Sequence, residues 1–279
     1  MNSPYLWLPL AGLLWVILEM TATFAFARRV RNYGVVDVVW SLGFAPLVLL
    51  YLGLAARWHY DTKLNAYPEW NWPAAWTLTV LVVLWAARLG GHLFVRVRSH
   101  HPVEDVRYAE LRREWGAGEA RRMFGFYLLQ GALQVVLSVP WLLTLLDPQH
   151  TTHFTLGPWA WLGIALWSFG WLGETIADRQ LARFRTNPTR RGQVCQDGLW
   201  YYSRHPNYFF EWVIWLGYAA FALGAPGGWL GLLSPLLMWH FLVNVTGIPM
   251  TEALSLKSKG EAYREYQRTT SAFIPWFKS

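Results

Sequence analysis

The sequence is poor in cysteine and in charged residues, and each shortage excludes a class of protein. The single cysteine, Cys195, rules out an intramolecular disulfide and a thiolate metal cluster. Charged residues make up 15% of the 279 residues, whereas a soluble domain contains about 25%. Hydrophobic residues make up 54%, and twenty are tryptophan, which suits a membrane protein with aromatic side chains at the bilayer interfaces.

Familiar metal and nucleotide motifs are also absent from the sequence. His92 and His100 are eight residues apart, and only His150 and His153, in a predicted outer loop, have the spacing of three or four that prepares a helical metal site. There is neither a Gly-Lys-Ser/Thr phosphate loop nor a Gly-x-Gly-x-x-Gly fingerprint. We therefore expect no metal site, and a nucleotide would bind between helices rather than on a sheet.

Seven apolar runs are long enough to cross a bilayer as helices, which takes about 20 residues each. They cover residues 6–27, 35–56, 74–95, 124–146, 158–177, 207–224 and 228–249. The predicted fold is an all-α polytopic membrane protein with seven transmembrane helices. No repeat or linker divides the chain, so a single domain over residues 1–279 is expected.

Positive charge falls on one side of the predicted spans. Of the 24 lysine and arginine residues, 22 lie in the segments 28–31, 88–122, 178–204 and 257–278, and the other two are Arg57 and Lys63. The positive-inside rule then places these segments and the C-terminus in the cytoplasm and the N-terminus outside. The net charge of +7 is thereby explained without a nucleic-acid partner, and an integral protein of the bacterial inner membrane is expected.

A charged cluster precedes the sixth apolar run, in the stretch LWYYSRHPNYFFEW at residues 199–212. Its proline predicts the first turn of a helix, whose N-terminus attracts phosphate. Arg204 and His205 would reinforce that attraction, while Asn207 and Glu211 would offer an amide and a carboxylate to a polar ring. The stretch predicts a cofactor site; the alternative is that Arg204 and His205 only anchor the helix at the lipid headgroups.

Ionisable residues inside the other predicted spans are costly and therefore informative. Glu174 and Asp178 share one helical face, and Arg185 lies two turns further along it. These carboxylates would bind ribose hydroxyls and the arginine a phosphate, or else the acids pair with arginines of the loop. Asp37 lies on the same predicted side of the membrane, whereas Glu19 lies deeper and stands apart.

Four separated blocks follow one another along nearly the whole chain. They are VVDVVWSLGF, GWLGETIADRQLARFR, GLWYYSRHPNYFFEWVIWLGYA and YREYQRTTSAFIPW. In these blocks the chain resembles the bacterial DUF1295 branch of the steroid 5-alpha-reductase superfamily. The resemblance implies a seven-helix membrane reductase that takes NADPH from the cytoplasmic side and reduces a carbon–carbon double bond in a lipophilic substrate from the bilayer.

The resemblance also implies roles for individual residues. Asp178 and Arg185 fall where steroid reductases hold an aspartate and an arginine in a cofactor segment, and Glu174 falls where they carry asparagine. Asn207, Tyr208 and Glu211 match a block in which the asparagine contacts the nicotinamide amide. The residues expected to bind NADPH are Glu174, Asp178, Arg185, Arg204, His205, Asn207, Tyr208, Glu211, Glu252 and Tyr266.

The proton-donating side of the reaction matches the family less well. Steroid reductases place a glutamate of helix 2 and a tyrosine of helix 3 about the substrate carbonyl. Asp37 can stand in for the glutamate, but the run at 74–95 contains no tyrosine. Either another residue donates the proton, with His92 and Tyr33 as the candidates, or the substrate is not a steroid enone.

Two other functions stay open. Isoprenylcysteine and phospholipid methyltransferases share the Arg-His-Pro-x-Tyr element and bind S-adenosylmethionine in a similar helical pocket. Their tail usually carries a Glu-Glu pair where this chain has Thr251 and Glu252, which favours the reductase. The other alternative is a non-catalytic lipid-binding membrane protein, which would have no affinity for nucleotides.

Overall fold

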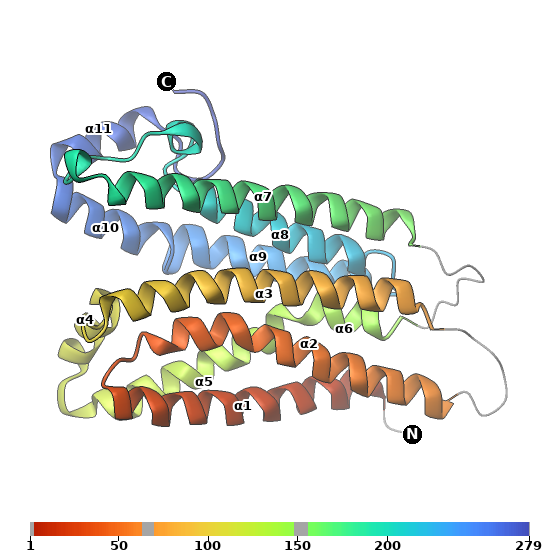
Figure 1. Cartoon of the computed structure of the whole chain (residues 1–279). Coiled ribbons are helices and arrows are strands. Elements are labelled where there is room, and N and C mark those ends of the chain that lie inside the picture. Colours follow the sequence, from red (N-terminus) through yellow and green to blue (C-terminus); the bar gives the residue numbers. More distant parts are fainter. Residues whose placement is uncertain (1–2, 63–69, 148–155, 279) are drawn as a thin grey trace. The chain divides into compact units, whose positions relative to one another are not determined.

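The computed structural model describes residues 3–62, 70–147 and 156–278, and within these ranges it contains helices and no strands (Figure 1). The α-helices are α1 Pro4–Val30, α2 Val35–Thr62, α3 Trp72–His100, α4 Val106–Trp115, α5 Glu119–Leu137, α6 Val139–Leu145, α7 Pro158–Thr186, α8 Pro206–Ala222, α9 Leu233–His240, α10 Ile248–Lys259 and α11 Glu261–Thr269. Short turns of helix connect them, among them η3 Gly198–Tyr201, η4 Gly228–Leu232 and the π-helical η5 Phe241–Val245. The all-α prediction is confirmed for the described residues.

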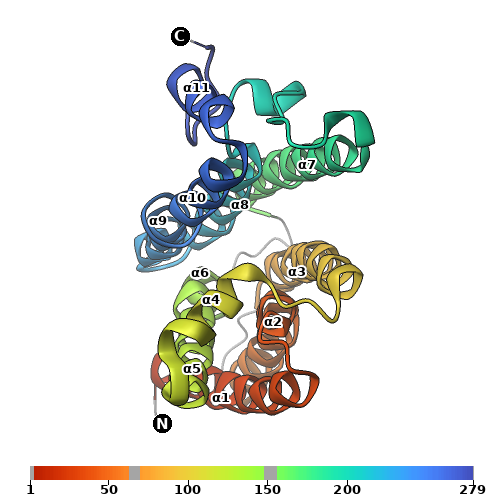
Figure 2. The same ribbon diagram turned by 90° about the vertical axis from the view of Figure 1, so that its left-hand side faces the viewer.

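The helices divide into two compact units, which Figure 2 shows end-on. Unit 1 comprises Met1–Leu156 and Ala225–Gly227 and contains α1 to α6. Unit 2 comprises Gly157–Gly224 and Gly228–Ser279 and contains α7 to α11. The single domain over residues 1–279 stays a prediction.

In unit 1, α2 packs along α3, and α1 packs along both α5 and α2. One end of this bundle has a core built around three buried tyrosines, Tyr33, Tyr108 and Tyr127, together with Met20 and Met123. This packing joins α4, which is too polar to be a span by itself, to the bundle of α1, α2 and α5.

In unit 2, α7 and α8 pack against each other more extensively than any other pair of helices. Glycines allow the two backbones to approach, as small residues commonly do between membrane helices. A Cβ on Gly170 would lie 2.7 Å from the carbonyl oxygen of Phe210, and one on Gly217 would lie 2.8 Å from the backbone nitrogen of Trp167. The close approach brings the polar ends of α7 and α8 together.

Five helical segments are long and apolar enough to cross a membrane: Pro4–Val30, Val35–Asp61, Trp72–Ser99, Val106–Leu145 and Gly228–Lys259. They are compatible with the predicted integral membrane protein. Helices α7 and α8 occupy the two remaining predicted spans, but α8 has only 17 residues, and the first half of α7 is rich in tryptophan and glycine. The count of seven spans, the outer N-terminus and the cytoplasmic C-terminus stay predictions.

Candidate functional site

The Asp178–Asn207 pair joins α7 to the first turn of α8. The Nδ2 atom of Asn207 donates a hydrogen bond to Oδ1 of Asp178 at 3.4 Å, near the long limit for such a bond. The other amide atom, Oδ1 of Asn207, is buried and has no hydrogen-bond partner among the described residues. Buried polar atoms are normally satisfied, so this oxygen is a candidate acceptor for a hydrogen bond from a ligand.

Two further carboxyl groups lie one turn deeper on the same helices. Glu174 on α7 and Glu211 on α8 are both buried, and Oε1 of Glu211 accepts a hydrogen bond from Nε1 of Trp215 at 2.9 Å. Glu211 therefore points into the interior of unit 2. Two buried carboxyl groups therefore lie one helical turn from the Asp178–Asn207 pair, and they make its surroundings strongly polar.

A second polar group, which we call the tail clamp, consists of Arg204, His205, Glu252 and Gln267. Nε of Arg204 donates to Oε1 of Glu252 at 2.6 Å, and Nε2 of His205 lies 3.2 Å from the same oxygen. Nε2 of Gln267 donates to the other carboxylate oxygen at 2.6 Å. The clamp thus connects the entry of α8 to α10 and α11.

The guanidinium of Arg204 is largely used inside the protein. Its Nη1 donates to the carbonyl oxygens of Gln267 at 2.9 Å and of Thr270 at 2.5 Å. Sequence reasoning assigned Arg204 to a phosphate, but in the structure it holds the C-terminal segment against α8. The phosphate role stays a prediction and would require at least some of these bonds to be exchanged.

His205 is the residue that precedes α8, and its imidazole is buried against the ring of Tyr208, with ring centroids 5.3 Å apart. Burial lowers the pKa of His205, and the hydrogen bond to Glu252 only partly opposes that effect. A neutral imidazole is therefore favoured near pH 7, and the phosphate-binding role of His205 stays a prediction.

The predicted tyrosines of unit 2 also make internal bonds. The Tyr266 hydroxyl donates to the carbonyl oxygens of Trp200 and Ser203, and burial raises the pKa of Tyr266, which keeps it a donor. The Tyr208 hydroxyl lies 3.2 Å from Oγ1 of Thr251. The hydroxyl groups of both tyrosines therefore connect neighbouring segments of unit 2 around the Asp178–Asn207 pair and the tail clamp.

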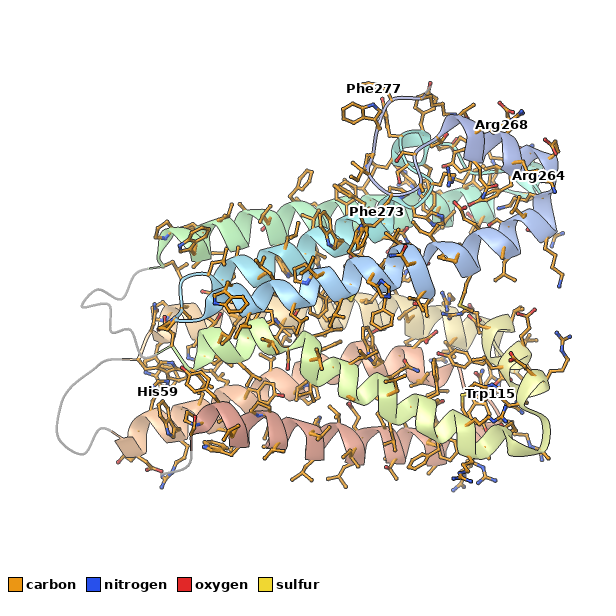
Figure 3. All side chains as sticks on the ribbon, turned by 180° about the vertical axis from the view of Figure 1, so that it is seen from behind. His59, Trp115, Arg264, Arg268, Phe273 and Phe277 are labelled. Carbon is orange, nitrogen blue, oxygen red and sulfur yellow. The ribbon has the colours of Figure 1, made fainter. Side chains whose placement is uncertain are left out.

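The C-terminal segment folds back over the entry of α8. Phe273 accepts a hydrogen bond from Oγ of Ser203 at 2.9 Å and packs against Phe209 and Trp212, with ring centroids 5.8 Å apart in each case (Figure 3). Trp276 donates its backbone N–H to the carbonyl oxygen of Tyr202 at 2.9 Å.

Arg185 lies near the exposed end of α7, two turns beyond Asp178. Lys259, at the end of α10, is close enough to interact electrostatically with it. Sequence reasoning missed Lys259 because the two residues are far apart along the chain. Two cations at this end of unit 2 favour an anionic ligand group there.

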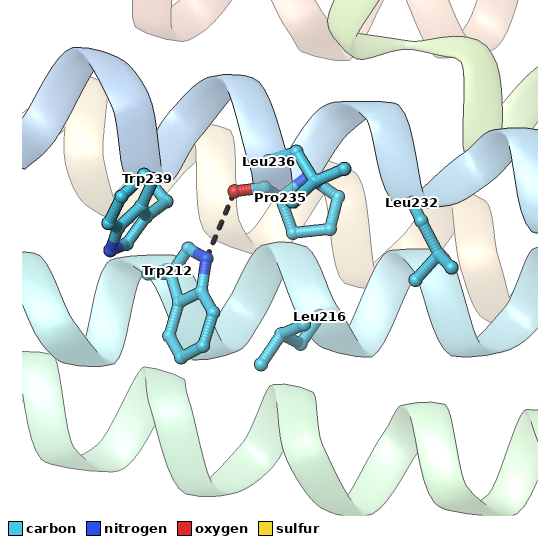
Figure 4. Close-up of a pocket in the computed structure, with 6 residues that line it drawn as sticks. All are labelled: Trp212, Leu216, Leu232, Pro235, Leu236 and Trp239. Carbon is cyan, nitrogen blue, oxygen red and sulfur yellow. Dashed lines mark hydrogen bonds between the residues drawn. The ribbon is translucent and has the colours of Figure 1, made fainter.

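Beside Phe273, an apolar groove of about 390 Å³ runs between α8 and the η4–α9 segment (Figure 4). Nε1 of Trp212 donates to the carbonyl oxygen of Pro235 at 3.0 Å across it. The groove is lined by Trp212, Leu216, Leu232, Pro235, Leu236 and Trp239. Its lining offers almost no polar atom to a ligand, so it suits a hydrocarbon chain.

Asp37 belongs to unit 1, where it accepts two short hydrogen bonds. The Tyr108 hydroxyl donates to its Oδ1 at 2.6 Å, and Nη2 of Arg107 donates to its Oδ2 at 2.6 Å. Arg96 lies 3.6 Å from the same carboxylate. Tyr108 comes from α4, so its bond to Asp37 joins segments that are 71 residues apart in the sequence.

The two predicted proton donors lie differently with respect to Asp37. Tyr33 is buried beside it in the turn between α1 and α2, and burial together with Glu119 raises its pKa to about 12. His92 is exposed on α3, and no hydrogen bond among the described residues joins it to Asp37. The structure therefore brings Tyr33, Tyr108 and Asp37 to one end of unit 1 without His92.

No group of three histidine, cysteine, aspartate or glutamate side chains within the described ranges is arranged to hold a metal ion. His150 and His153, the histidine pair with metal-like spacing, lie outside those ranges.

Comparison with known proteins places the chain among its relatives. Residues 23–270 match the family described as "Protein of unknown function (DUF1295)". An uncharacterized protein of Schizosaccharomyces pombe (strain 972) is 26% identical over 221 residues, a match that covers 71% of this chain and 62% of the yeast protein. The match thus spans less than two thirds of that relative's length. No solved structure is significantly similar.

Proposed function

The chain belongs to the DUF1295 family, and on this premise we propose that it is a membrane-embedded reductase that uses NADPH to reduce a carbon–carbon double bond in a lipophilic substrate. The family is associated with the steroid 5-alpha-reductase superfamily. The observation that carries the proposal is the Asp178–Asn207 pair, with its buried and unpaired amide oxygen.

The residues around this pair fit the polar parts of NADPH. The Oδ1 atom of Asn207 accepts and therefore suits the N–H of a carboxamide, while the carboxylate of Asp178 suits ribose hydroxyls. Arg185 and Lys259 lie at the exposed end of the same unit and suit phosphate groups. NADPH supplies a hydride to the substrate when it is bound.

Each unit, taken by itself, has a feature that suits a lipophilic substrate with a carbonyl group. The groove at Trp212 and Leu236 would hold an alkyl or prenyl chain, because its lining is apolar and its η4–α9 side belongs to the candidate membrane span Gly228–Lys259. In unit 1, Asp37 and Arg107 orient the Tyr108 hydroxyl. A hydroxyl of this kind can donate a hydrogen bond to a carbonyl oxygen that gains negative charge.

Methyl transfer from S-adenosylmethionine is the second candidate, and the tail clamp is the observation that favours it. Glu252 of the tail meets both Arg204 and His205, which is the element shared with the methyltransferases. The position of their other glutamate is held by Thr251, whose hydroxyl contacts Tyr208. Because threonine has no carboxylate, the chain departs from the methyltransferases at this position. We therefore rank methyl transfer second.

Ligand binding to the purified full chain separates these functions. NADPH, NADH and S-adenosylmethionine would each be titrated into the protein in detergent, with quenching of tryptophan fluorescence as the signal. We expect saturable quenching by NADPH. A response to S-adenosylmethionine alone would turn the conclusion to methyl transfer, and silence with all three ligands would turn it to lipid binding.

A further inference from the structure

Glu19 is an acidic side chain in the middle of α1, and the proposed reductase site does not use it. Its Oε2 atom is buried without a hydrogen-bond partner among the described residues. Helix α1 is long and apolar enough to cross a membrane, and an ionised carboxylate in such surroundings is destabilised by several kcal/mol. Ionisable groups at such positions usually have a function.

Gln134 on α5 is fully buried next to this carboxyl group. Its Nε2 atom donates to the carbonyl oxygen of Trp40 at 2.8 Å, which sets the orientation of the amide. Its Oε1 atom is buried and has no partner in the described part of the chain. The two side chains therefore present two unpaired acceptor atoms in the interior of one helix bundle.

Gly43 on α2 completes the arrangement by leaving room for the carboxyl group. A Cβ at this position would lie 2.5 Å from both carboxyl oxygens of Glu19 and 2.7 Å from Nε2 of Gln134. Helices α1, α2 and α5 therefore hold the carboxyl group of Glu19 and the amide of Gln134 close to the backbone of Gly43. The location of the carboxyl group is fixed by packing.

The groups that surround Glu19 are uncharged. Gln134 is the side chain that acts on its carboxyl group, and Ser138, one turn beyond Gln134 on α5, has its Oγ 3.4 Å from the hydroxyl of Tyr51 on α2. No charged side chain of α2, α5 or α6 acts on Glu19 within the described residues. A negative charge on Glu19 would therefore lack a compensating cation.

We propose that Glu19 and Gln134 form a proton-binding site inside the bundle of α1, α2 and α5, with the proton held on Oε2 of Glu19. The proton neutralises the carboxyl group and converts an unpaired acceptor into a hydroxyl donor. It is taken from water and returned to water, so no other reactant is consumed. This site is independent of the proposed reductase function.

A row of polar side chains on α5 gives the proton a path. Gln130, Gln134 and Ser138 are four residues apart and share one helical face, and the amide nitrogen of Gln130 is buried without a partner among the described atoms. One turn before Gln130, the Tyr127 hydroxyl donates to the carbonyl oxygen of Tyr33 at 2.6 Å. The row therefore leads from Glu19 to the end of unit 1 that carries Tyr33.

Infrared spectroscopy of the full chain in nanodiscs tests the site directly. At neutral pH we expect a C=O stretching band of a protonated carboxyl group that shifts to lower frequency in D₂O. Glu19→Gln should remove this band while the far-ultraviolet circular dichroism stays unchanged. Absence of the band from the natural protein, or its full retention in Glu19→Gln, would overturn the proposal.

A glycine pair on α2 gives a matched control that keeps Glu19 in place. Gly43→Ala pushes a methyl group into the carboxyl group, so we expect the band to shift or vanish. Gly53→Ala adds the same methyl group where nothing lies within 4 Å and should leave the band unchanged. An unaltered band in folded Gly43→Ala protein would also contradict the site.

The path is tested by the rate at which the band moves after transfer into D₂O. Gln130→Leu removes a polar step and should slow this exchange severalfold without removing the band. An unchanged exchange rate in that variant would rule out the row on α5 as the path.

Discussion

The tail clamp and the Asp178–Asn207 pair begin at neighbouring residues of the same helix, but their hydrogen bonds are made to very different extents. In the clamp, Arg204 and Gln267 hold both oxygens of Glu252 at 2.6 Å. In the pair, Asn207 reaches Asp178 at 3.4 Å and keeps an unpaired oxygen. A satisfied network stabilises a fold, whereas a half-satisfied one is suited to a ligand. The clamp therefore supports the fold, and the pair is the element that we propose for ligand binding.

Breaking the clamp should have the largest effect on stability. Arg204→Ala leaves the carboxylate of Glu252 and two backbone carbonyl groups without their cation, so we expect a loss of about 3–5 kcal/mol in the free energy of unfolding. Unfolding in mixed detergent and SDS measures the loss, and limited proteolysis should then cut the C-terminal segment. Arg204 and Glu252 have side chains only 11% and 13% exposed.

Arg268→Ala is the matched control for that variant. Arg268 pairs with Glu265 on the outer face of α11, and their side chains are 71% and 55% exposed (Figure 3). Exposed pairs contribute at most about 1 kcal/mol. Equal losses in the two variants would contradict the supporting role of the clamp.

Asn207→Ala should have the opposite profile, with a larger effect on binding than on stability. Removal of a directed hydrogen bond of about 1–1.5 kcal/mol weakens NADPH affinity roughly tenfold, because 1.4 kcal/mol is a factor of ten. The free energy of unfolding should change little, since the bond to Asp178 is long. Fluorescence titration with NADPH checks the affinity, and unfolding in mixed detergent and SDS checks the stability, with Asn244→Ala, at an exposed asparagine of the same unit, as the control in both.

The buried imidazole of the clamp predicts a dependence on pH. Because burial lowers the pKa of His205, the unfolded chain binds a proton at this residue at a higher pH than the folded chain does. Stability contributed by neutral His205 is therefore present above about pH 6.5, the usual histidine value, and is lost as the pH falls toward the lower pKa of the folded state.

This dependence can be measured as the free energy of unfolding between pH 7.5 and pH 5. His205→Gln should flatten the decline, and His240→Gln, at an exposed position, should not. A decline of equal slope in His205→Gln would show that other groups cause it.

Tyr208→Phe should have the smallest effect of these changes. It removes one hydroxyl that lies 3.2 Å from Thr251, so we expect a loss of about 0.5–1.5 kcal/mol. A double-mutant cycle with Thr251→Val isolates the pair. Full additivity of the two losses would mean that the hydroxyls do not interact.

Local features of this site were predictable from the sequence, since they depend on spacing along one helix. Pro206 begins α8 as its position in the sequence predicted. Asp178 and Arg185 follow from helical periodicity on α7. The hydrogen bond between Asp178 and Asn207 joins two helices and was not predicted.

Contacts between distant segments were not predictable from spacing. Arg204 is 48 residues from Glu252, and Tyr108 is 71 residues from Asp37. The sequence shows an arginine before a helix but not the carboxylate that pairs with it. Sequence alone therefore predicts that Arg204 binds a phosphate, and it does not predict the bond to Glu252. In the same way, a charged segment before α5 gave no sign that its tyrosine returns to α2.

The most direct test of the account is amide hydrogen exchange of the full chain with and without NADPH. The account predicts that NADPH slows exchange in peptides that contain Asp178–Arg185 and Asn207–Glu211, and that Asn207→Ala greatly reduces this protection. Protection confined to other parts of the chain, or equal protection in Asn207→Ala, would contradict the assignment of the Asp178–Asn207 pair as the binding element.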